Sequence, residues 1–235
     1  MEAEYARLAK VIRDLASAHH RRRYLVAIAG VPGSGKTTTA EAILRYITAG
    51  PLAMNATLVP MDGFHLPRTT LDQLPNREEA YIRRGAPWTF DVARFVAFIR
   101  RLRTWADAEL STSSQVLHAP GFCHETKDPV EDVHIVTDET SIVILEGNYL
   151  LLDEPEWRDI SQLVDYRVFV ETDLQEARAR LAKRHVQSGI ENSLEEAFRR
   201  VDRNDYLNSI AILQKLITPD LVVRTVIGLR SVEQL

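Results

Sequence analysis

A short glycine-rich run near the start of the chain has the residue types that bind a triphosphate. Residues 30–37 read Gly-Val-Pro-Gly-Ser-Gly-Lys-Thr and match G-x-x-x-x-G-K-[ST] at every fixed position. Glycines let backbone N–H groups turn toward crowded anions, and the helix expected to follow presents its positive end to them. In this reading Lys36 reaches the β- and γ-phosphates, and the Thr37 hydroxyl completes a magnesium shell. The residues expected to hold the nucleotide are Gly30, Val31, Pro32, Gly33, Ser34, Gly35, Lys36, Thr37 and Thr38.

Two acidic residues come at the ends of apolar runs that read as strands. Glu146 directly follows Ser141–Leu145, and Asp62 follows Thr57–Met61. Ligands of open α/β sheets bind beyond the carboxyl ends of the strands, so Glu146 is a candidate for supporting the metal. We expect the strand before Asp62 to lie beside the first strand, which would open Asp62 into the same crevice as a base. A solvated carboxylate at position 146 and a turn-forming Asp-Gly at 62–63 are the alternatives.

A phosphate-binding loop alone is compatible with several classes of protein. The guanine-selecting sequence N-K-x-D is missing from the chain, and the nearest stretch, Thr-Lys-Asp at 126–128, does not fit it. A kinase needs a group that orients and deprotonates the acceptor hydroxyl beside the γ-phosphate, and Asp62 meets that need. Two alternatives stay open. One is an NTP hydrolase or nucleotide-dependent switch, in which Asp62 and residues 63–90 bind a partner protein; the other is a non-catalytic ATP-binding module.

The apolar pattern predicts the elements that position these residues. Near-continuous apolar runs, typical of buried parallel strands, alternate with amphipathic helices. This alternation predicts a three-layer α/β/α fold with a mostly parallel central sheet, in one domain over residues 1–235. Strands are expected at Tyr24–Ala29, Thr57–Met61, Ser141–Leu145, Tyr166–Val170 and Leu221–Val226, with short ones at Gln115–His118 and Val133–Val136. Helices are expected within residues 1–23, at Lys36–Thr48, from Phe90 to about Glu109 with Thr89 as its cap, at Asp173–Gln187 and from Ser193 to about Lys215, and residues 63–88 read as a long loop.

Composition narrows the class of protein further. The 235 residues include 29 Lys and Arg against 33 Asp and Glu, a formal net charge of −4. This balance gives no general attraction to nucleic acid or to an anionic membrane, and we expect the Arg21–Arg23 run to be a solvated edge. A single cysteine, Cys123, excludes an internal disulfide, and no apolar run approaches the roughly 20 residues that span a bilayer. We therefore expect a cytoplasmic protein, with a homodimer as the default assembly.

Five stretches together resemble a known family. Besides the loop at 30–37, the chain has Met-Asp-Gly-Phe-His at 61–65, Arg-Gly-Ala-Pro-x-Thr-Phe-Asp at 84–91, Lys-Asp-Pro-Val at 127–130 and Leu-Glu-Gly-Asn-Tyr at 145–149. In this order they look like the phosphoribulokinase/uridine kinase family of P-loop kinases, over residues from about 24 to 226. They are most similar to the branch with D-G-F-H and G-A-P-x-T-F-D. The resemblance implies ATP- and Mg²⁺-dependent transfer of the γ-phosphoryl group to a hydroxyl of a small metabolite, either nucleoside-like or sugar-like.

The resemblance also implies roles for individual residues. Asp62 would be the catalytic base, Lys36 and Thr37 would hold ATP and magnesium, and Glu146 would support the metal. Acceptor-binding groups would come from Asp62, His65, Arg84 and His124. A basic helical lid would lie at about 173–192, with Arg180 and Arg184 four residues apart on one face for phosphate oxygens. The resemblance is weakest at Phe-Cys-His in 122–124, where family members often carry an aromatic residue followed by Asp.

Overall fold

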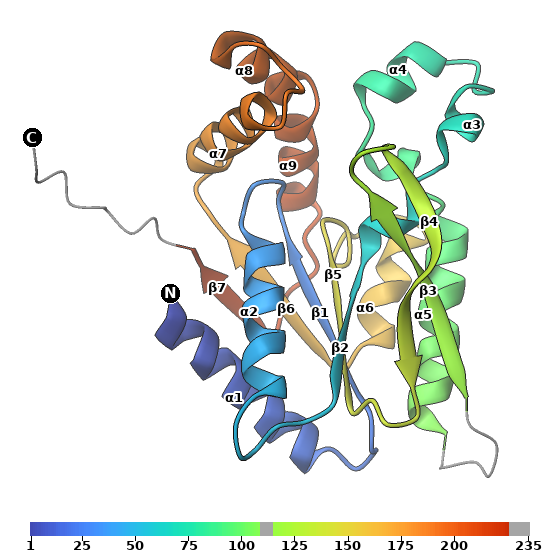
Figure 1. Ribbon diagram of the computed structural model, residues 1–235, viewed down its shortest axis with the longest axis vertical. Helices are drawn as coiled ribbons and strands as arrows, with labels where there is room; N and C mark the ends of the chain where they lie inside the picture. Colours follow the sequence, from blue (N-terminus) through green and yellow to red (C-terminus); the bar gives the residue numbers. More distant parts are fainter. Residues whose placement is uncertain (109–114, 226–235) are drawn as a thin grey trace, which may run out of the picture.

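A parallel sheet forms the centre of the molecule (Figure 1). The computed structural model describes residues 1–108 and 115–225, and in them the strands of this sheet lie in the order β2-β5-β1-β6-β7. Every neighbouring pair is parallel. The strands are β1 (Tyr24–Gly30), β2 (Ala56–Pro60), β5 (Ile142–Gly147), β6 (Tyr166–Glu171) and β7 (Leu221–Arg224).

Side chains of the central strands alternate between two hydrophobic clusters, one on each face of the sheet. On β1, Val26 and Ile28 belong to the cluster that contains α1 (Glu2–Ala18) and α2 (Lys36–Thr48). Leu25 and Ala27 belong to the other cluster, which contains α5 (Val92–Asp107). Both faces of β1 are therefore buried, which explains its unbroken apolar sequence. The predicted three-layer α/β/α fold is confirmed.

Several of the remaining elements lie at the carboxyl ends of the strands. An antiparallel pair, β3 (Val116–Cys123) and β4 (Asp128–Thr137), packs against the short 3₁₀ helix η1 (Met61–Phe64) that follows β2. In Figure 1 the helices α7, α8 and α9 stand above the loop between β1 and α2, at the carboxyl end of the sheet, and α3 and α4 stand beside them. The bounds are α3 (Arg68–Leu71), α4 (Arg77–Ile82), η2 (Pro87–Thr89), η3 (Trp157–Asp159), α6 (Ile160–Leu163), α7 (Leu174–Gln187), α8 (Leu194–Arg203) and α9 (Asp205–Gln214). None of the helices among the described residues has the length and apolarity required to cross a bilayer.

The structure corrects the predicted strand neighbours. β2 pairs with β5, so β5 separates it from β1 and the prediction that these two strands are adjacent is wrong. Pro60 on β2 and Ile28 on β1 both pair with Glu146 of β5. The sequence gives each strand's identity through its apolar run but carries no local signal for its neighbours. The ends of the three strands still meet at one edge of the sheet, because all three run parallel.

Three further differences concern local structure. Residues 63–88 are not a continuous loop but contain α3 and α4. The α5 cap is Asp91, whose carboxylate accepts from the Arg94 amide at 3.0 Å, while the Thr89 hydroxyl accepts from the Gly85 amide instead. The single helix predicted from Ser193 is broken at Asn204 into α8 and α9. The predicted ends at Glu109 and Val226 lie outside the described residues.

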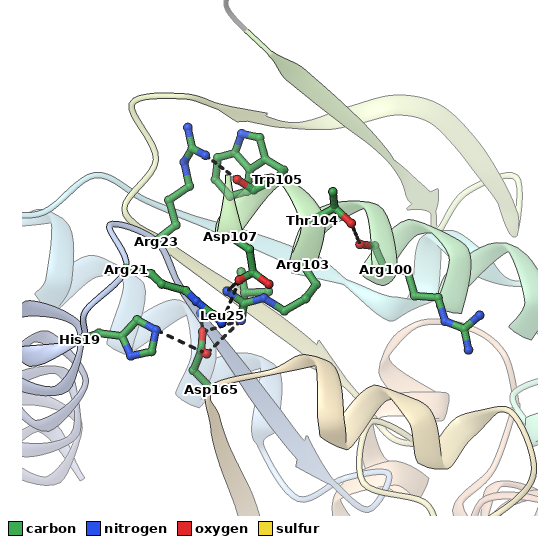
Figure 2. A network of polar contacts seen from close by, with 10 residues as sticks. All are labelled: His19, Arg21, Arg23, Leu25, Arg100, Arg103, Thr104, Trp105, Asp107 and Asp165. Atoms are coloured by element: carbon green, nitrogen blue, oxygen red, sulfur yellow. Dashed lines mark hydrogen bonds and ion pairs between the residues drawn. The ribbon is translucent and has the colours of Figure 1, made fainter. Parts of the chain in front are cut away.

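A polar network joins the amino ends of the strands, opposite the glycine-rich loop (Figure 2). Arg23 is only 3% exposed, so the expectation of a solvated Arg21–Arg23 edge is wrong at this residue. Its guanidinium donates to the Trp105 carbonyl and to Asp138 at 2.7 Å, and lies 4.1 Å from the centre of the Trp105 ring. Beside it, Asp165 accepts from the Leu25 amide at 2.8 Å and pairs with Arg103. These contacts fasten α5 to the start of β1.

Replacing Arg23 with leucine should lower the free energy of unfolding by about 2 kcal/mol. The substitution removes a buried guanidinium and leaves its acceptors with fewer donors. Urea denaturation of the wild type and of Arg23→Leu measures the difference. Arg22→Leu is the matched control, because Arg22 is exposed, and it should change stability by less than about 0.5 kcal/mol. Equal losses in the two variants would contradict a structural role for the buried guanidinium.

Candidate active site

The glycine-rich loop leads from the end of β1 into the first turn of α2. Gly33 and Gly35 have φ values of +78° and +87°, which favour glycine. At Gly30 a Cβ would lie 2.6 Å from the Ser34 hydroxyl and 2.8 Å from the Val170 carbonyl, so only glycine fits between loop and sheet. The Thr225 hydroxyl donates to the Ser34 carbonyl at 2.9 Å and holds the loop to the end of β7. The predicted loop therefore has the backbone that cradles phosphate at a helix N-terminus.

Glu146 lies at the end of β5 between the loop and Asp62. Its side chain is 7% exposed, and Oε1 is 3.7 Å from the Lys36 Nζ. Burial raises the pKa of Glu146, and the negative charge of Asp62 adds to the rise. The positive charge of Lys36 and a hydrogen bond from the Thr37 hydroxyl oppose it. The structure thus places Lys36 and Thr37 against Glu146, with Asp62 near enough for its charge to act on the same carboxyl group.

Asp62 is exposed on the 3₁₀ helix η1, whose backbone is held tightly in place. Its neighbours Met61 and Phe64 are buried in the hydrophobic core. A Cβ at Gly63 would lie 1.9 Å from the Pro120 carbonyl oxygen of β3, so glycine is required where η1 meets the hairpin. The Asp-Gly pair therefore does form a turn, and that turn holds the Asp62 carboxylate at the edge of the sheet.

Aromatic rings line the side of the site beyond Asp62. The His65 Nδ1 is 2.8 Å from the Asp62 carbonyl oxygen, and the ring centroid lies 3.9 Å from Phe90 and 4.9 Å from Phe122. Burial lowers the pKa of His65. A neutral ring facing a carbonyl through Nδ1 carries its proton there, which leaves Nε2 as a hydrogen-bond acceptor. The His124 ring lies 5.5 Å from Phe122 and extends the cluster.

Arg84 reaches the same cluster from the segment before η2. Its Nη2 donates to the Leu66 carbonyl at 3.1 Å and is 3.6 Å from Asp128, and the guanidinium carbon lies 5.8 Å from the Phe122 ring. Its Nε is buried and has no hydrogen-bond partner. The sequence reasoning missed Asp128 as a partner of Arg84, although the Lys-Asp-Pro-Val stretch around it belongs to the motifs of the family.

The two arginines predicted for a lid occupy different surroundings on α7. The Arg180 Nη1 is 3.4 Å from the Gly33 carbonyl of the glycine-rich loop. Arg184 is exposed, and its charge acts on Asp205 at the start of α9. Burial raises the pKa of Asp205, whereas the charges of Arg184, Arg200 and Lys36 lower it. Asp205 therefore lies within electrostatic range of the loop lysine.

Helices α7 and α8 pack on each other through a hydrophobic cluster of their own. The cluster contains Leu181 and Ala182 of α7 and Ala197 and Val201 of α8. At its edge, Arg178 pairs with Asp202 at 2.5 Å and lies 4.3 Å over the Phe198 ring. Most of the buried residues of this pair are thus separate from the core of the sheet.

His185 of α7 makes the stability of this helix pair depend on pH. It is 7% exposed, and burial together with the nearby Arg200 and Arg184 lowers its pKa to about 4. An unfolded histidine has a pKa of about 6.5, so the unfolded chain binds the extra proton first. The contribution of the neutral His185 to the free energy of unfolding is intact above about pH 6.5 and is lost as pH falls toward 4.

We therefore expect the wild type to lose about 2 kcal/mol more stability than His185→Leu between about pH 7.5 and pH 5. Leucine fills much of the ring's volume but takes up no proton. Urea denaturation of both proteins at the two pH values measures the difference. The same pH dependence in both proteins would show that His185 does not titrate in this way.

The donor groups at the loop suit a hard divalent cation. Mg²⁺ is usually held by one or two carboxylates together with substrate phosphates and water. The Thr37 hydroxyl and the Glu146 carboxylate lie against each other here, beside the phosphate cradle. Within residues 1–108 and 115–225, no cluster of three or more His, Cys, Asp or Glu side chains forms a metal cage. A magnesium ion at this place would therefore be shared between the protein and the nucleotide.

Comparison with known proteins identifies the family of the chain and relatives of its fold. A proposed uridine kinase of Schizosaccharomyces pombe is 38% identical over 205 residues, which cover 87% of this chain and 84% of that protein. A crystal structure described as a proposed fructose transport system kinase from Silicibacter sp. TM1040 has a TM-score of 0.78 and 31% identity, covering 93% and 98% of the two chains. YFH7 of Saccharomyces cerevisiae, a proposed P-loop kinase with a circular permutation, shares the fold with a TM-score of 0.84 at 24% identity over 94% and 99% of the chains. Residues 25–211 match the sequence profile of the phosphoribulokinase/uridine kinase family, and the chain belongs to this family of P-loop kinases.

Proposed function

We propose that this kinase transfers the γ-phosphoryl group of ATP to a hydroxyl group of a small metabolite. The observation that carries the proposal is the convergence of three strand ends. Glu146 on β5 pairs with β1 on one side and β2 on the other, so the phosphate loop and Asp62 flank it. Neighbouring strands lie about 4.8 Å apart, which gives about 10 Å between the ends of β1 and β2. This span accommodates a terminal phosphate and an attacking hydroxyl between the two groups.

The nucleotide side of the reaction falls to the loop and to α7. In the proposal the backbone of residues 30–38 and the Lys36 ammonium bind the phosphates, and Lys36 stabilises charge on the γ-phosphoryl oxygens. Thr37 and Glu146 hold Mg²⁺, which when bound neutralises charge on the β- and γ-phosphates. Arg180, beside the Gly33 carbonyl, and Arg184 further along α7 are placed to bring cations toward the phosphates as the helix pair closes and water is excluded.

Asp62 is the proposed base. As the acceptor oxygen forms its bond to the γ-phosphorus, the bond from that phosphorus to the β-γ bridging oxygen breaks and ADP leaves. The hydroxyl proton passes to the Asp62 carboxylate, which later releases it to solvent. The exposure of Asp62 fits this return of the proton, and the rigid turn at Gly63 fits the need for an oriented carboxylate.

The acceptor is proposed to bind against the His65, Phe90 and Phe122 rings. His65 offers an acceptor at Nε2, Arg84 offers a buried donor at Nε, and His124 adjoins Phe122. A nucleoside base and the apolar face of a sugar both suit such rings. The relatives described as uridine kinase and fructose transport system kinase make uridine and fructose the first compounds to test.

An ADP-release assay over a panel of acceptors tests the proposal. The panel contains uridine and other nucleosides, ribosyl pyridines, fructose and other hexoses, glycerate and pantothenate, each with Mg²⁺ and ATP. A kinase of this type releases ADP in proportion to the phosphorylated acceptor, which mass spectrometry identifies. Rapid ADP release that no acceptor changes would instead indicate the hydrolase or switch function.

Asp62→Asn should lower acceptor-dependent ADP release by a factor of about a hundred or more and leave ATP affinity within about twofold. The amide is nearly isosteric with the carboxylate but cannot take the proton. Asp14→Asn, on the exposed face of α1, is the matched control and should behave as the wild type. Lys36→Ala should weaken ATP binding as well as turnover. Full activity in Asp62→Asn would show that another group is the base.

A further inference from the structure

The break between α8 and α9 contains two buried asparagines. Asn204 has φ −132° and ψ −74°, outside helical geometry, and is 6% exposed, while Asn208 is 2% exposed. An interrupted helix and two buried side-chain amides are unfavourable unless the polar groups find partners. The hydrogen-bond partners of the Asn204 and Asn208 side chains therefore indicate why the helix is interrupted here.

Arg83, on the other side of the site, supplies those partners. Its Nε donates to the Asn204 Oδ1 at 3.2 Å, and its Nη2 donates to the Asn208 Oδ1 at 3.0 Å. The Asn208 amide donates to the same Asn204 oxygen at 3.1 Å. The guanidinium thus binds two amide oxygens, with the added strength of a charged donor. We call these three side chains the amide–guanidinium clasp.

The clasp also fixes the backbone of the next residue, Arg84. The Asn204 Nδ2 donates to the Arg84 carbonyl at 2.8 Å. One residue further, the Gly85 carbonyl accepts from the Tyr149 hydroxyl, and the Gly85 amide donates to Thr89. Residues 83–85 are therefore held from α9, from the segment after β5 and from η2. Within this fixed segment the Arg84 side chain turns the other way, toward Leu66 and Phe122.

The helices on either side of Asn204 are linked to the nucleotide loop through α7. α8 packs on α7, whose Arg180 lies beside the Gly33 carbonyl. Asp205, adjacent to Asn204 in the chain, is near enough to Lys36 for the lysine charge to lower its pKa, against the stronger effect of burial. Asn204 therefore lies at a junction between the nucleotide side and the acceptor side of the site.

We propose that Asn204 is a positioning residue, which sets Arg84 for the acceptor and links the acceptor segment at 83–85 to the helices α7 and α8. The inference rests on the proposed kinase function, because it gives Arg84 an acceptor to bind. Asn204 acts through its hydrogen bond to the Arg84 carbonyl and through the Arg83 guanidinium that it binds.

Steady-state kinetics with Asn204→Ala test the positioning role. Uridine and fructose serve as acceptor probes, with the most active member of the acceptor panel if that is a different compound. We expect the KM for the acceptor to rise about tenfold, the loss typical of one buried hydrogen bond, while the KM for ATP stays within twofold. Leu207→Ala is the matched control, because Leu207 lies on α9 and is 46% exposed. Wild-type kinetics in a folded Asn204→Ala would overturn the proposal.

Two further variants separate positioning from general destabilisation. Asn204→Asp keeps an oxygen that accepts from Arg83 but loses the donor to the Arg84 carbonyl. It should therefore raise the acceptor KM although the Arg83 hydrogen bond is retained. Arg83→Lys keeps the charge but loses the two-pronged geometry, and should raise the same KM. If Asn204→Ala does not fold, these two variants carry the test. An unchanged acceptor KM in both would reject the proposal.

Hydrogen–deuterium exchange gives a readout that does not depend on turnover. With Mg²⁺ and the nonhydrolysable analogue AMP-PNP as the probe, Asn204→Ala should exchange about tenfold faster than wild type at residues 83–90 and unchanged at residues 30–37. Leu207→Ala should match the wild type. If no acceptor is phosphorylated by the wild type, the proposed function fails while faster exchange still supports the link. Unchanged exchange at 83–90 would reject the link even in an active kinase.

Discussion

The burial of a carboxylate between two strand ends is the constraint on which the site depends. Glu146 is enclosed by β1 and β2, and burial alone would favour its neutral form. Lys36 and Thr37 supply the positive charge and the donor that oppose this, whereas Asp62 works against them. Because the carboxyl groups of Glu146 and Asp62 lie near a single ammonium, that of Lys36, a further positive charge is favourable here. A phosphate-bound cation would supply that charge, so this geometry suits a magnesium nucleotide.

The molecule combines a central sheet with two large hydrophobic clusters and a helix pair, α7 and α8, that has a hydrophobic cluster of its own. Asp62 and the phosphate loop directly follow strands of the parallel sheet, whose central residues are buried in hydrophobic clusters on both faces. Much of the contact between α7 and α8 comes instead from the small cluster around Leu181 and Val201. A pair with its own cluster can move as a unit at less cost than an element shared with the main core. The groups proposed to orient the reaction therefore follow strands of the sheet, and the arginines of the proposed lid lie on the helix pair.

The parts of the site that sequence reasoning found are those encoded by local patterns. The glycine spacing at 30–37 and the apolar runs before Asp62 and Glu146 are each readable in a few residues. What the sequence did not show depends on long-range contacts. The insertion of β5 between β1 and β2 joins Glu146 to residues 118 and 86 positions earlier in the chain, and the burial of Arg23 depends on Trp105. The break at Asn204 was missed because the helical pattern continues through it and its reason, Arg83, is far away in the chain.

Cys123, at a position where the family resemblance implies an acidic residue, lies across the hairpin from Asp128. Cys123 pairs with Asp128 in the β3–β4 register, so a carboxylate is present beside the ring cluster after all. It is engaged, however, by the Arg68 amide at 2.8 Å and lies 3.6 Å from Arg84. A carboxylate held in this way orients Arg84 more than it binds an acceptor hydroxyl. In the proposed function, the side chains beside the rings that then bind the acceptor are His65, Arg84 and His124. Asp62, which is exposed, is left as the carboxylate that faces the acceptor hydroxyl.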